Sequence, residues 1–361
     1  MYMLNKVSIF FRVDASASIG TGHVMRCLTL ADELVKHNAA VTFVCRQLPE
    51  YLKQLIQSHH HTLLELPVWA IDNDSPPEGI WSQEQQLKDV KETINIISEI
   101  LWDYLVVDHY RLDHVWEKEF RNYTKKILVI DDLADRVHDC DLLLDQNFYM
   151  DMNDRYVDKV SAHCQLLLGP KYALLREEFR QAHLKAKPRT TINRILVCFG
   201  GSDPDNYTGR VIDVLAQMDL KNIAIDVVIG AQHPARDAIE YLSERNNFSC
   251  HIQVNNMAEL MLAADLAIGS GGSISCERCC LGLPALCFSL AVNQIAILES
   301  LHHCGAIIYL GSSESISLEI LHDSLLSMIE DVDQFEKIST HAFELTDGYG
   351  VERVSYELLA A

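Results

Sequence analysis

The sequence predicts an α/β protein built from two doubly wound, Rossmann-like domains that face each other across a cleft. Short apolar runs alternate with amphipathic helical patterns from end to end, which is typical of parallel sheets covered by helices. The 361 residues exceed what one hydrophobic core usually contains. A polar segment with a proline, Ala186 to Thr191, interrupts the alternation near its middle. We therefore expect an N-terminal domain over residues 1–187 and a C-terminal domain over residues 188–361, with a hinge at 186–191.

The predicted elements follow in order. Strands of the first domain are expected at Val7–Val13, Val41–Val44, Thr62–Leu66, Tyr104–Val107, Ile127–Ile130 and Asp141–Leu144. Helices are expected at Val24–His37, Leu48–Ser58, Ser82–Ile100 and His114–Tyr123, and prolines favour a surface loop over Pro67–Gly79. Strands of the second domain are expected at Ile195–Phe199, Ile223–Ile229, His251–Val254, Leu266–Ile268, Ala285–Phe288 and Ala306–Ile308, with helices between them. The helix after Gly350 is a candidate to pack back on the first domain.

The composition and net charge of the chain argue against some classes of binding partner. Hydrophobic residues make up 48% and charged residues 22%, as in ordinary globular proteins. The net charge of -21 argues against binding to nucleic acid or to anionic lipid, since both require basic surface. No apolar run reaches the roughly 20 residues of a membrane span, and the first residues lack a signal-peptide pattern. Most of the eleven cysteines fall in apolar patterns, which favours a reducing cytoplasm.

Three groups of side chains raise the question of a metal. Cys276, Cys279 and Cys280 have no second ligand pair at zinc spacing, and His59-His60-His61 has no acidic or cysteine companion nearby. Asp131-Asp132 follows a strand and suits either a metal pair or the cap of a turn. We expect no metal and no cofactor.

The loop Gly20-Thr21-Gly22-His23 is the most informative stretch. It joins a strand to a helix, and two glycines there allow a tight turn and close approach to a ligand. The helix N-terminus offers free N–H groups and a partial positive charge, which suit a phosphate. His23 lies at the edge of this site and is the side chain best able to move a proton near neutral pH. The loop therefore suggests chemistry on a nucleotide or sugar phosphate.

Two glycine-rich turns of the second half also join a strand to a helix and could bind phosphate in the same way. Gly200-Gly201 ends a strand and precedes a Ser-Asp-Pro sequence, which fits either a diphosphate clamp or a capped helix start. Gly269-Ser270-Gly271-Gly272-Ser273 opens the helix that carries Glu277. That carboxylate could accept hydrogen bonds from ribose hydroxyls. Alternatively, its negative charge could simply interact favourably with the partial positive charge of the helix N-terminus.

Further polar groups follow predicted strands. Asp108-His109-Tyr110 suits a sugar pocket, against ordinary loop polarity. Asn293-Gln294 suits sugar hydroxyls or phosphate oxygens, although on the sequence pattern alone a polar helix start is favoured. Lys171 and Arg176 are candidate cations of the cleft or hinge, against surface solvation.

Together these stretches resemble the UDP-sugar hydrolases of pseudaminic acid biosynthesis, which act on UDP-2,4-diacetamido-2,4,6-trideoxy-β-L-altropyranose. The resemblance rests on Arg12 to Ser16 leading into Gly20 to Arg26, on Asp108-His109-Tyr110 and on Gly169 to Arg176. The second half, with Gly200-Gly201, Glu277 and Asn293-Gln294, is similar to the nucleotide-binding half of these enzymes and of their GT-B relatives. One such relative is the N-acetylglucosaminyltransferase of peptidoglycan synthesis.

The resemblance implies a GT-B fold, release of UDP and no metal requirement. It makes His23 the expected catalytic base and Glu277 a ribose ligand. The remaining substrate-binding candidates are Arg12, Asp14, Gly20, Gly22, Arg26, Asp108, Tyr110, Gly200, Gly201, Ser202, Gly271, Gly272, Ser273, Asn293 and Gln294. The chain departs from these relatives in a longer insertion around Pro67–Ser82 and in its tail after Gly311.

The expected function is hydrolysis of a UDP-linked diacetamido-trideoxy sugar. In this hypothesis His23 takes a proton from water, the water attacks the anomeric carbon, and the configuration inverts. The alternatives are a GT-B glycosyltransferase with another acceptor and a non-catalytic nucleotide-sugar binder. Apart from the UDP-sugar we expect no nucleic-acid or membrane partner, and a monomer or weak homodimer.

Overall fold

The computed structural model describes residues 6–16, 19–69, 79–98, 101–201, 203–312 and 318–360. The chain divides into two compact units. Unit 1 comprises Met1–Gln146, Asp151–Leu174 and Gly350–Ala361, and unit 2 comprises Asn147–Met150 and Leu175–Tyr349. Ser202 and most of the predicted loop Pro67–Gly79 lie outside the described residues.

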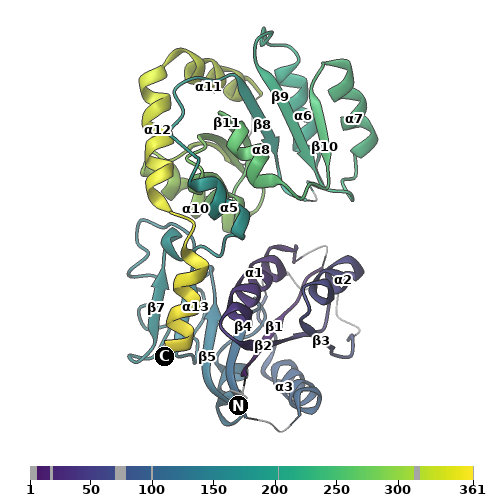
Figure 1. Ribbon diagram of the computed structural model, residues 1–361, viewed down its shortest axis with the longest axis vertical. Helices are drawn as coiled ribbons and strands as arrows, with labels where there is room; N and C mark the ends of the chain where they lie inside the picture. The colour runs from purple at the N-terminus through teal and green to yellow at the C-terminus, as the bar shows by residue number, and fades with distance from the viewer. Residues whose placement is uncertain are drawn as a thin grey trace, which may run out of the picture. The chain divides into compact units, whose positions relative to one another are not determined.

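Unit 1 is built on a seven-stranded parallel sheet with the order β3-β2-β1-β4-β5-β6-β7 (Figure 1). Its strands are β1 (Val7–Val13), β2 (Ala39–Cys45), β3 (Thr62–Glu65), β4 (Trp102–Asp108), β5 (Thr124–Ile130), β6 (Leu142–Asp145) and β7 (Gln165–Leu168). Its helices are α1 (Gly22–Lys36), α2 (Glu50–Ser58), α3 (Gln83–Ile97), α4 (His114–Glu119) and α13 (Gly350–Ala360), with short 3₁₀ turns η1 (Phe120–Asn122) and η2 (Pro170–Tyr172).

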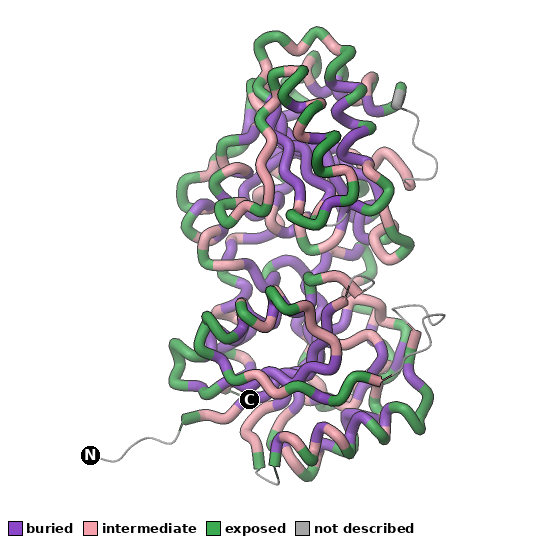
Figure 2. Tube along the Cα trace, turned by 90° about the vertical axis from the view of Figure 1, so that its right-hand side faces the viewer, coloured by how far each residue is buried: buried purple, intermediate pink, exposed green. Residues whose placement is uncertain are grey.

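Alternation along β1 divides the core of unit 1 into two layers. Ile9, Phe11 and Val13 face a cluster that includes residues of α1, α2 and α13. Phe10 faces the opposite cluster, which includes residues of α3 and α4. Because successive strand side chains point to opposite faces, a strand with buried apolar side chains on both faces, such as β1, requires helices on both. Figure 2 shows the buried residues concentrated along the strands.

Unit 2 repeats the plan with six parallel strands in the order β10-β9-β8-β11-β12-β13. The strands are β8 (Arg194–Cys198), β9 (Ala224–Ile229), β10 (Ser249–Ile252), β11 (Leu266–Ser270), β12 (Ala285–Ser289) and β13 (Ile308–Ser312). The helices are α5 (Glu177–His183), α6 (Tyr207–Leu215), α7 (Arg236–Arg245), α8 (Met257–Ala263), α9 (Ile274–Cys280), α10 (Val292–His303), α11 (Leu318–Glu330) and α12 (Val332–Leu345).

The two predicted doubly wound halves are therefore confirmed, with one unpredicted strand. The strand β7 is a four-residue edge strand, too short to give a clear alternation. The division between the units differs from the predicted 187/188, because the chain enters unit 2 at Leu175 and returns to unit 1 at Gly350. Helix α13 packs against α1 and η2 within unit 1.

The segment predicted as a hinge, 186–191, lies within unit 2. Arg189 is 7% exposed, and its guanidinium donates to the backbone carbonyls of Leu281 and Met261, the latter at 3.2 Å. Its backbone N–H donates to Ser339 Oγ at 2.8 Å. The polar residues and the proline in this segment indicated the absence of a helix or strand, but they did not indicate mobility.

In both sheets the strand order reverses between two central strands. These are β1 and β4 in unit 1, and β8 and β11 in unit 2. Ligands of doubly wound sheets bind at this switch point, outside the carboxyl ends of the strands. The glycine loops and Asp108-His109-Tyr110 follow these four strands. Within the described part of the chain, no helix combines the length and the apolar character that crossing a membrane requires.

Candidate functional site

His23 lies in the first turn of α1, directly after the glycine loop that leaves β1. Thr21 occupies the N-cap position, and its side chain makes no capping hydrogen bond. Gly20 has a φ of 83°, in the left-handed region that favours glycine, and Gly22 is exposed. Among the described residues no side chain accepts from the first amide groups of α1, so these groups are suited to an anion.

The imidazole of His23 is held by a carboxylate from the neighbouring strand. Its Nδ1 lies 2.5 Å from Asp108 Oδ1, at the end of β4. Arg26, one turn further along α1, binds both oxygens of Asp108, with Nε 2.6 Å from Oδ2 and Nη2 2.7 Å from Oδ1. The side chain of Asp108 is completely buried.

The Asp108 carboxylate determines which nitrogen of His23 carries the proton. Burial alone would raise the pKa of Asp108, but the charge of Arg26 and the hydrogen bonds from Arg26 and His23 outweigh it and hold that pKa well below its ordinary value. An ionised carboxylate only accepts hydrogen bonds, so Nδ1 of His23 donates to it. In the neutral imidazole Nε2 then carries no proton, and it makes no hydrogen bond to any of the described residues. This arrangement suits a general base.

Tyr110 and Asp132 complete the surroundings of His23. The Tyr110 ring meets the imidazole edge-on, with centroids 4.4 Å apart. Burial, together with the Asp132 carboxylate, raises the pKa of Tyr110 far above its ordinary value, so the phenol stays neutral. Asp132 also binds Arg26 Nη1 at 2.9 Å. A turn cap was predicted at Asp132, but it is Asp131 that accepts from the amide of Ala134, at 2.8 Å.

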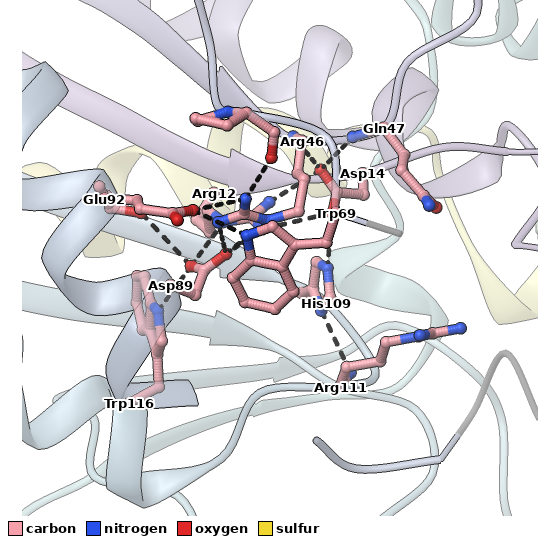
Figure 3. A network of polar contacts seen from close by, with 12 residues as sticks. Arg12, Asp14, Arg46, Gln47, Trp69, Asp89, Glu92, His109, Arg111 and Trp116 are labelled. Carbon is pink, nitrogen blue, oxygen red and sulfur yellow. Dashed lines mark hydrogen bonds and ion pairs between the residues drawn. The ribbon is translucent and has the colours of Figure 1, made fainter. Parts of the chain in front are cut away.

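Beside this group lies a buried ionic network (Figure 3). Arg12 binds Asp14 through Nη1 at 2.8 Å and Asp89 of α3 through Nη2 at 2.8 Å. Arg46, after β2, reaches Asp89 at 2.7 Å and stacks its guanidinium 3.8 Å from the centre of the Trp69 ring. Asp14 also accepts from the Arg46 amide at 2.6 Å and from His109 Nε2 at 2.9 Å.

The network gives Arg12 and Asp14 protein partners. Arg12 has no exposed surface, Asp14 is 3% exposed, and their polar atoms are directed at protein partners. Both residues therefore stabilise the segments that carry His23 and His109, and their contact with a substrate stays a prediction. Asp89 and Arg46, which sequence reasoning missed, are equal members of the network.

In unit 2 the turn after β8 differs from the glycine loop of α1. Gly200 has a φ of 96°, and Gly201 backs onto Gly230 so closely that a Cβ on Gly230 would overlap the Gly201 carbonyl. Asp203 accepts from the amides of Tyr207 and Thr208 at 2.9 and 2.8 Å. Because side chains occupy the start of α6, the structure supports the capped-helix interpretation there.

The loop after β11 packs closely against helix α10. A Cβ on Gly271 would approach Leu298 of α10 to 3.0 Å and Gln294 to 3.2 Å, so glycine lets the loop pack on α10. Gly272 has a φ of 92°, and the exposed Ser273 precedes α9 without capping it through its side chain. This loop and the start of α10 are therefore adjacent in unit 2.

Glu277 projects from α9 behind this loop. Its Oε1 lies 3.2 Å from Arg176 Nη2, and the side chain keeps 21% of its surface exposed. Burial raises the pKa of Glu277 although Arg176 opposes the shift. Arg176 also pairs with Glu178 at 2.8 Å, so it is not an uncommitted cation.

The amide pair at the start of α10 divides between two roles. Gln294 Oε1 accepts from the amide of Leu290 at 2.9 Å, which is the structural role considered for a polar helix start. Asn293 Oδ1 is buried without a hydrogen-bond partner among the described residues, and so remains a candidate ligand contact.

The remaining candidates of the sequence are a cation and the possible metal ligands. Lys171 Nζ lies 4.9 Å from the centre of the adjacent Tyr172 ring. Across the described ranges of the chain, no three His, Cys, Asp or Glu side chains are grouped as a metal ion would require. All eleven cysteines are free.

Comparison with known proteins supports the predicted resemblance. No protein-family model matches the chain. It is 28% identical to the UDP-2,4-diacetamido-2,4,6-trideoxy-β-L-altropyranose hydrolase of Campylobacter jejuni, over 78% of this chain and 92% of that enzyme. It is 26% identical to the spore coat polysaccharide biosynthesis protein SpsG of Bacillus subtilis, over 97% and 96% of the two chains. It also spans about half, 54%, of an uncharacterised protein of Methanocaldococcus jannaschii at 27% identity.

Solved structures establish the fold. The crystal structure of MurG from Acinetobacter baumannii has a TM-score of 0.70 to this chain, covering 99% of it and 100% of MurG at 12% identity. The glycosyltransferase of kitacinnamycin has a TM-score of 0.65 at 16% identity, covering 99% of each chain. The predicted GT-B fold is confirmed, as is the resemblance to the sugar-nucleotide hydrolase.

Proposed function

We propose that this chain hydrolyses a UDP-linked diacetamido-trideoxy sugar to UDP and the free sugar. The observation that carries the proposal is the Asp108-oriented His23, which lies in the first turn of α1 and whose Nε2 has no hydrogen-bond partner among the described residues. The similarity to the Campylobacter jejuni hydrolase supports the substrate class. The similarity to SpsG is consistent with a role in making precursors of a surface polysaccharide.

In the proposed mechanism His23 acts as the general base. Nε2 takes a proton from water while the water oxygen forms a bond to the anomeric carbon. The bond from that carbon to the diphosphate oxygen breaks, UDP leaves with the electron pair, and the configuration inverts. Asp108 stabilises the imidazolium that forms, as the carboxylate of a catalytic triad does. Amide groups at the start of α1 would face the diphosphate.

Incubation with a UDP-sugar and no acceptor tests the reaction class. A hydrolase releases UDP steadily under these conditions, whereas a glycosyltransferase needs its acceptor and a binding protein releases none. Reaction in ¹⁸O-labelled water then identifies the bond that breaks. Label in the sugar supports attack at carbon, whereas label in the UDP phosphate would require another role for His23.

Replacing Glu277 by alanine should weaken UDP binding by about 1–3 kcal/mol, because ribose hydroxyls would lose a buried acceptor. Calorimetric titration with UDP measures the change. The matched control is Glu259→Ala, which removes an exposed carboxylate from α8 of the same unit and should leave the affinity unchanged. Equal affinities for UDP in the Glu277→Ala protein and the wild type would reject the ribose role.

Hydrolysis should continue at full rate in excess EDTA. Backbone N–H groups and helix termini can neutralise a leaving diphosphate without a divalent cation. Steady-state assays with and without the chelator check this expectation. Loss of activity that magnesium or manganese restores would contradict it and bring Asp131 and Asp132 into consideration as ligands.

A further inference from the structure

Arg111 is an exception among the buried arginines of this chain. Seven arginines of the described residues are less than one-tenth exposed: Arg12, Arg26, Arg46, Arg111, Arg136, Arg189 and Arg278. Six of them donate side-chain hydrogen bonds to carboxylates, carbonyls or other protein acceptors. Within that described set, only the Arg111 side chain donates none, and its Nε is buried without a partner.

This lack of a partner is costly and cannot be ascribed to a shortage of acids. The chain has 51 acidic residues against 30 lysines and arginines. Arg111 is 7% exposed, so water replaces the missing acceptors only in part. Among the described residues its guanidinium contacts only the Trp81 ring, whose centre lies 5.9 Å away. A contact of that length compensates little of the desolvation cost.

The backbone of Arg111, by contrast, is fixed at both ends. Its N–H donates to His109 Nδ1 at 3.1 Å, and its carbonyl accepts from the Trp81 amide at 3.0 Å. His109 in turn donates from Nε2 to Asp14, so the buried ionic network anchors the position of Arg111. In Figure 3 the guanidinium points away from Asp89 and Glu92. Several polar groups thus fix the position of Arg111, while its guanidinium has no acceptor among the described residues.

The surroundings of Arg111 belong to the site of His23. Asp108, His109, Tyr110 and Arg111 are consecutive after β4, at the switch point of the sheet. Asp108 orients His23, and Tyr110 packs against it. Trp81 lies beside Arg111 and packs against Trp69, with ring centroids 5.0 Å apart. Trp81 is buried and Trp69 is partly exposed, so the exposed part of this aromatic pair suits the apolar atoms of a sugar or of its methyl substituents.

We propose that Arg111 is a substrate-binding residue that donates to a carbonyl or carboxylate oxygen on the sugar of the nucleotide sugar, with Trp81 beside it. This inference rests on the proposed function for the identity of the ligand. It explains why a buried guanidinium is held in place without a protein acceptor, since the acceptor arrives with the substrate. A guanidinium fits carboxylate and acyl oxygens better than isolated hydroxyls.

The first test uses the ligand-free protein. Arg111→Met should unfold in urea at the same midpoint as the wild type or a higher one, because the change removes an unpaired buried charge. All four tryptophans lie in unit 1, so their fluorescence follows the unit that contains Arg111. Arg12→Met, which removes a paired arginine, should lower the midpoint. A lower midpoint for Arg111→Met would make Arg111 a structural residue and overturn the proposal.

The second test measures binding of UDP, UDP-glucose, UDP-N-acetylglucosamine and UDP-glucuronic acid. The wild type should bind at least one of the two acceptor-bearing sugars, acetamido or carboxylate, more tightly than UDP-glucose. Arg111→Met should weaken that binding by about 10- to 100-fold without changing the affinity for UDP. Arg121→Met, which removes an arginine paired with Asp139 and Asp141, is the matched control and should bind all four like the wild type.

The outcomes separate this proposal from the proposed function. The same order and ratios of affinity in Arg111→Met and the wild type would overturn the role of Arg111 while leaving the hydrolase proposal intact. A wild type that binds neither UDP nor any UDP-sugar would overturn the hydrolase proposal. In that case the urea midpoints still distinguish the two roles of Arg111. An unchanged or higher midpoint in Arg111→Met supports a ligand-binding residue, and a lower one supports a structural residue.

Discussion

Replacing His23 by alanine should lower kcat for UDP-sugar hydrolysis by about 10²–10⁴-fold, the usual contribution of a general base. The physical reason is the orientation of the ring, since Asp108 holds the proton on Nδ1 and leaves Nε2 to accept one from water. The measurement is UDP release at saturating substrate. UDP affinity should remain, because the proposed ribose contact lies in unit 2.

A matched control removes a histidine of the same unit outside the site. His59 is partly exposed and pairs with Asp32, so His59→Ala should retain the wild-type rate. Asp108→Asn is a second test of His23 as the base. It removes the charge that stabilises the imidazolium, so the hydrolysis rate of this variant should fall as well. A His23→Ala enzyme within a few-fold of the wild-type rate would assign the base to another group.

Most of the fold could be predicted because its signals are local. Apolar runs of four to seven residues and helices with one buried face recur along the chain, and all six strands predicted in each half are present. The exceptions are places where local patterns carry no information on packing. Arg189 stands in a polar, proline-containing segment, yet its guanidinium is buried against carbonyls more than 70 residues away.

The site could be predicted only in outline, for a related reason. The glycine loop of His23 is a local signal, and so is Asp108 after a strand. Their contact joins residues 85 apart in the sequence, and only the sheet order brings them together. Arg12 lies in β1 and Asp14 directly follows that strand, but the burial of both depends on Asp89 and Arg46.

One signal for the buried network was present in the helix α3. Its buried face includes Gln86, Asp89 and Thr93 alongside Val90 and Ile97. A charged residue on the inward face of a helix is almost never buried without a partner. Asp89 therefore indicated a buried cation, although the sequence alone could not identify Arg12 and Arg46 as that cation.

Replacing Asp89 by alanine should lower the free energy of unfolding of unit 1 by about 3–5 kcal/mol, because it leaves two buried guanidinium groups without their shared carboxylate. Trp116 Nε1 also loses its acceptor, 2.9 Å away. Urea unfolding followed by tryptophan fluorescence measures the change in this unit. Glu84→Ala, an exposed change in the first turn of the same helix, should cost less than about 1 kcal/mol.

The same network gives the stability a defined dependence on pH. Burial alone would raise the pKa of Asp89, but Arg12 and Arg46 outweigh it and lower that pKa in the folded protein. A carboxyl whose pKa is lower in the folded than in the unfolded state contributes stability above its unfolded pKa and loses it as the pH falls through the folded value. The gap between wild type and Asp89→Ala should therefore be full at neutral pH and narrow on acidification below the ordinary range of aspartate. A gap that stays constant down to strongly acid pH would show that Asp89 contributes by packing and not by charge.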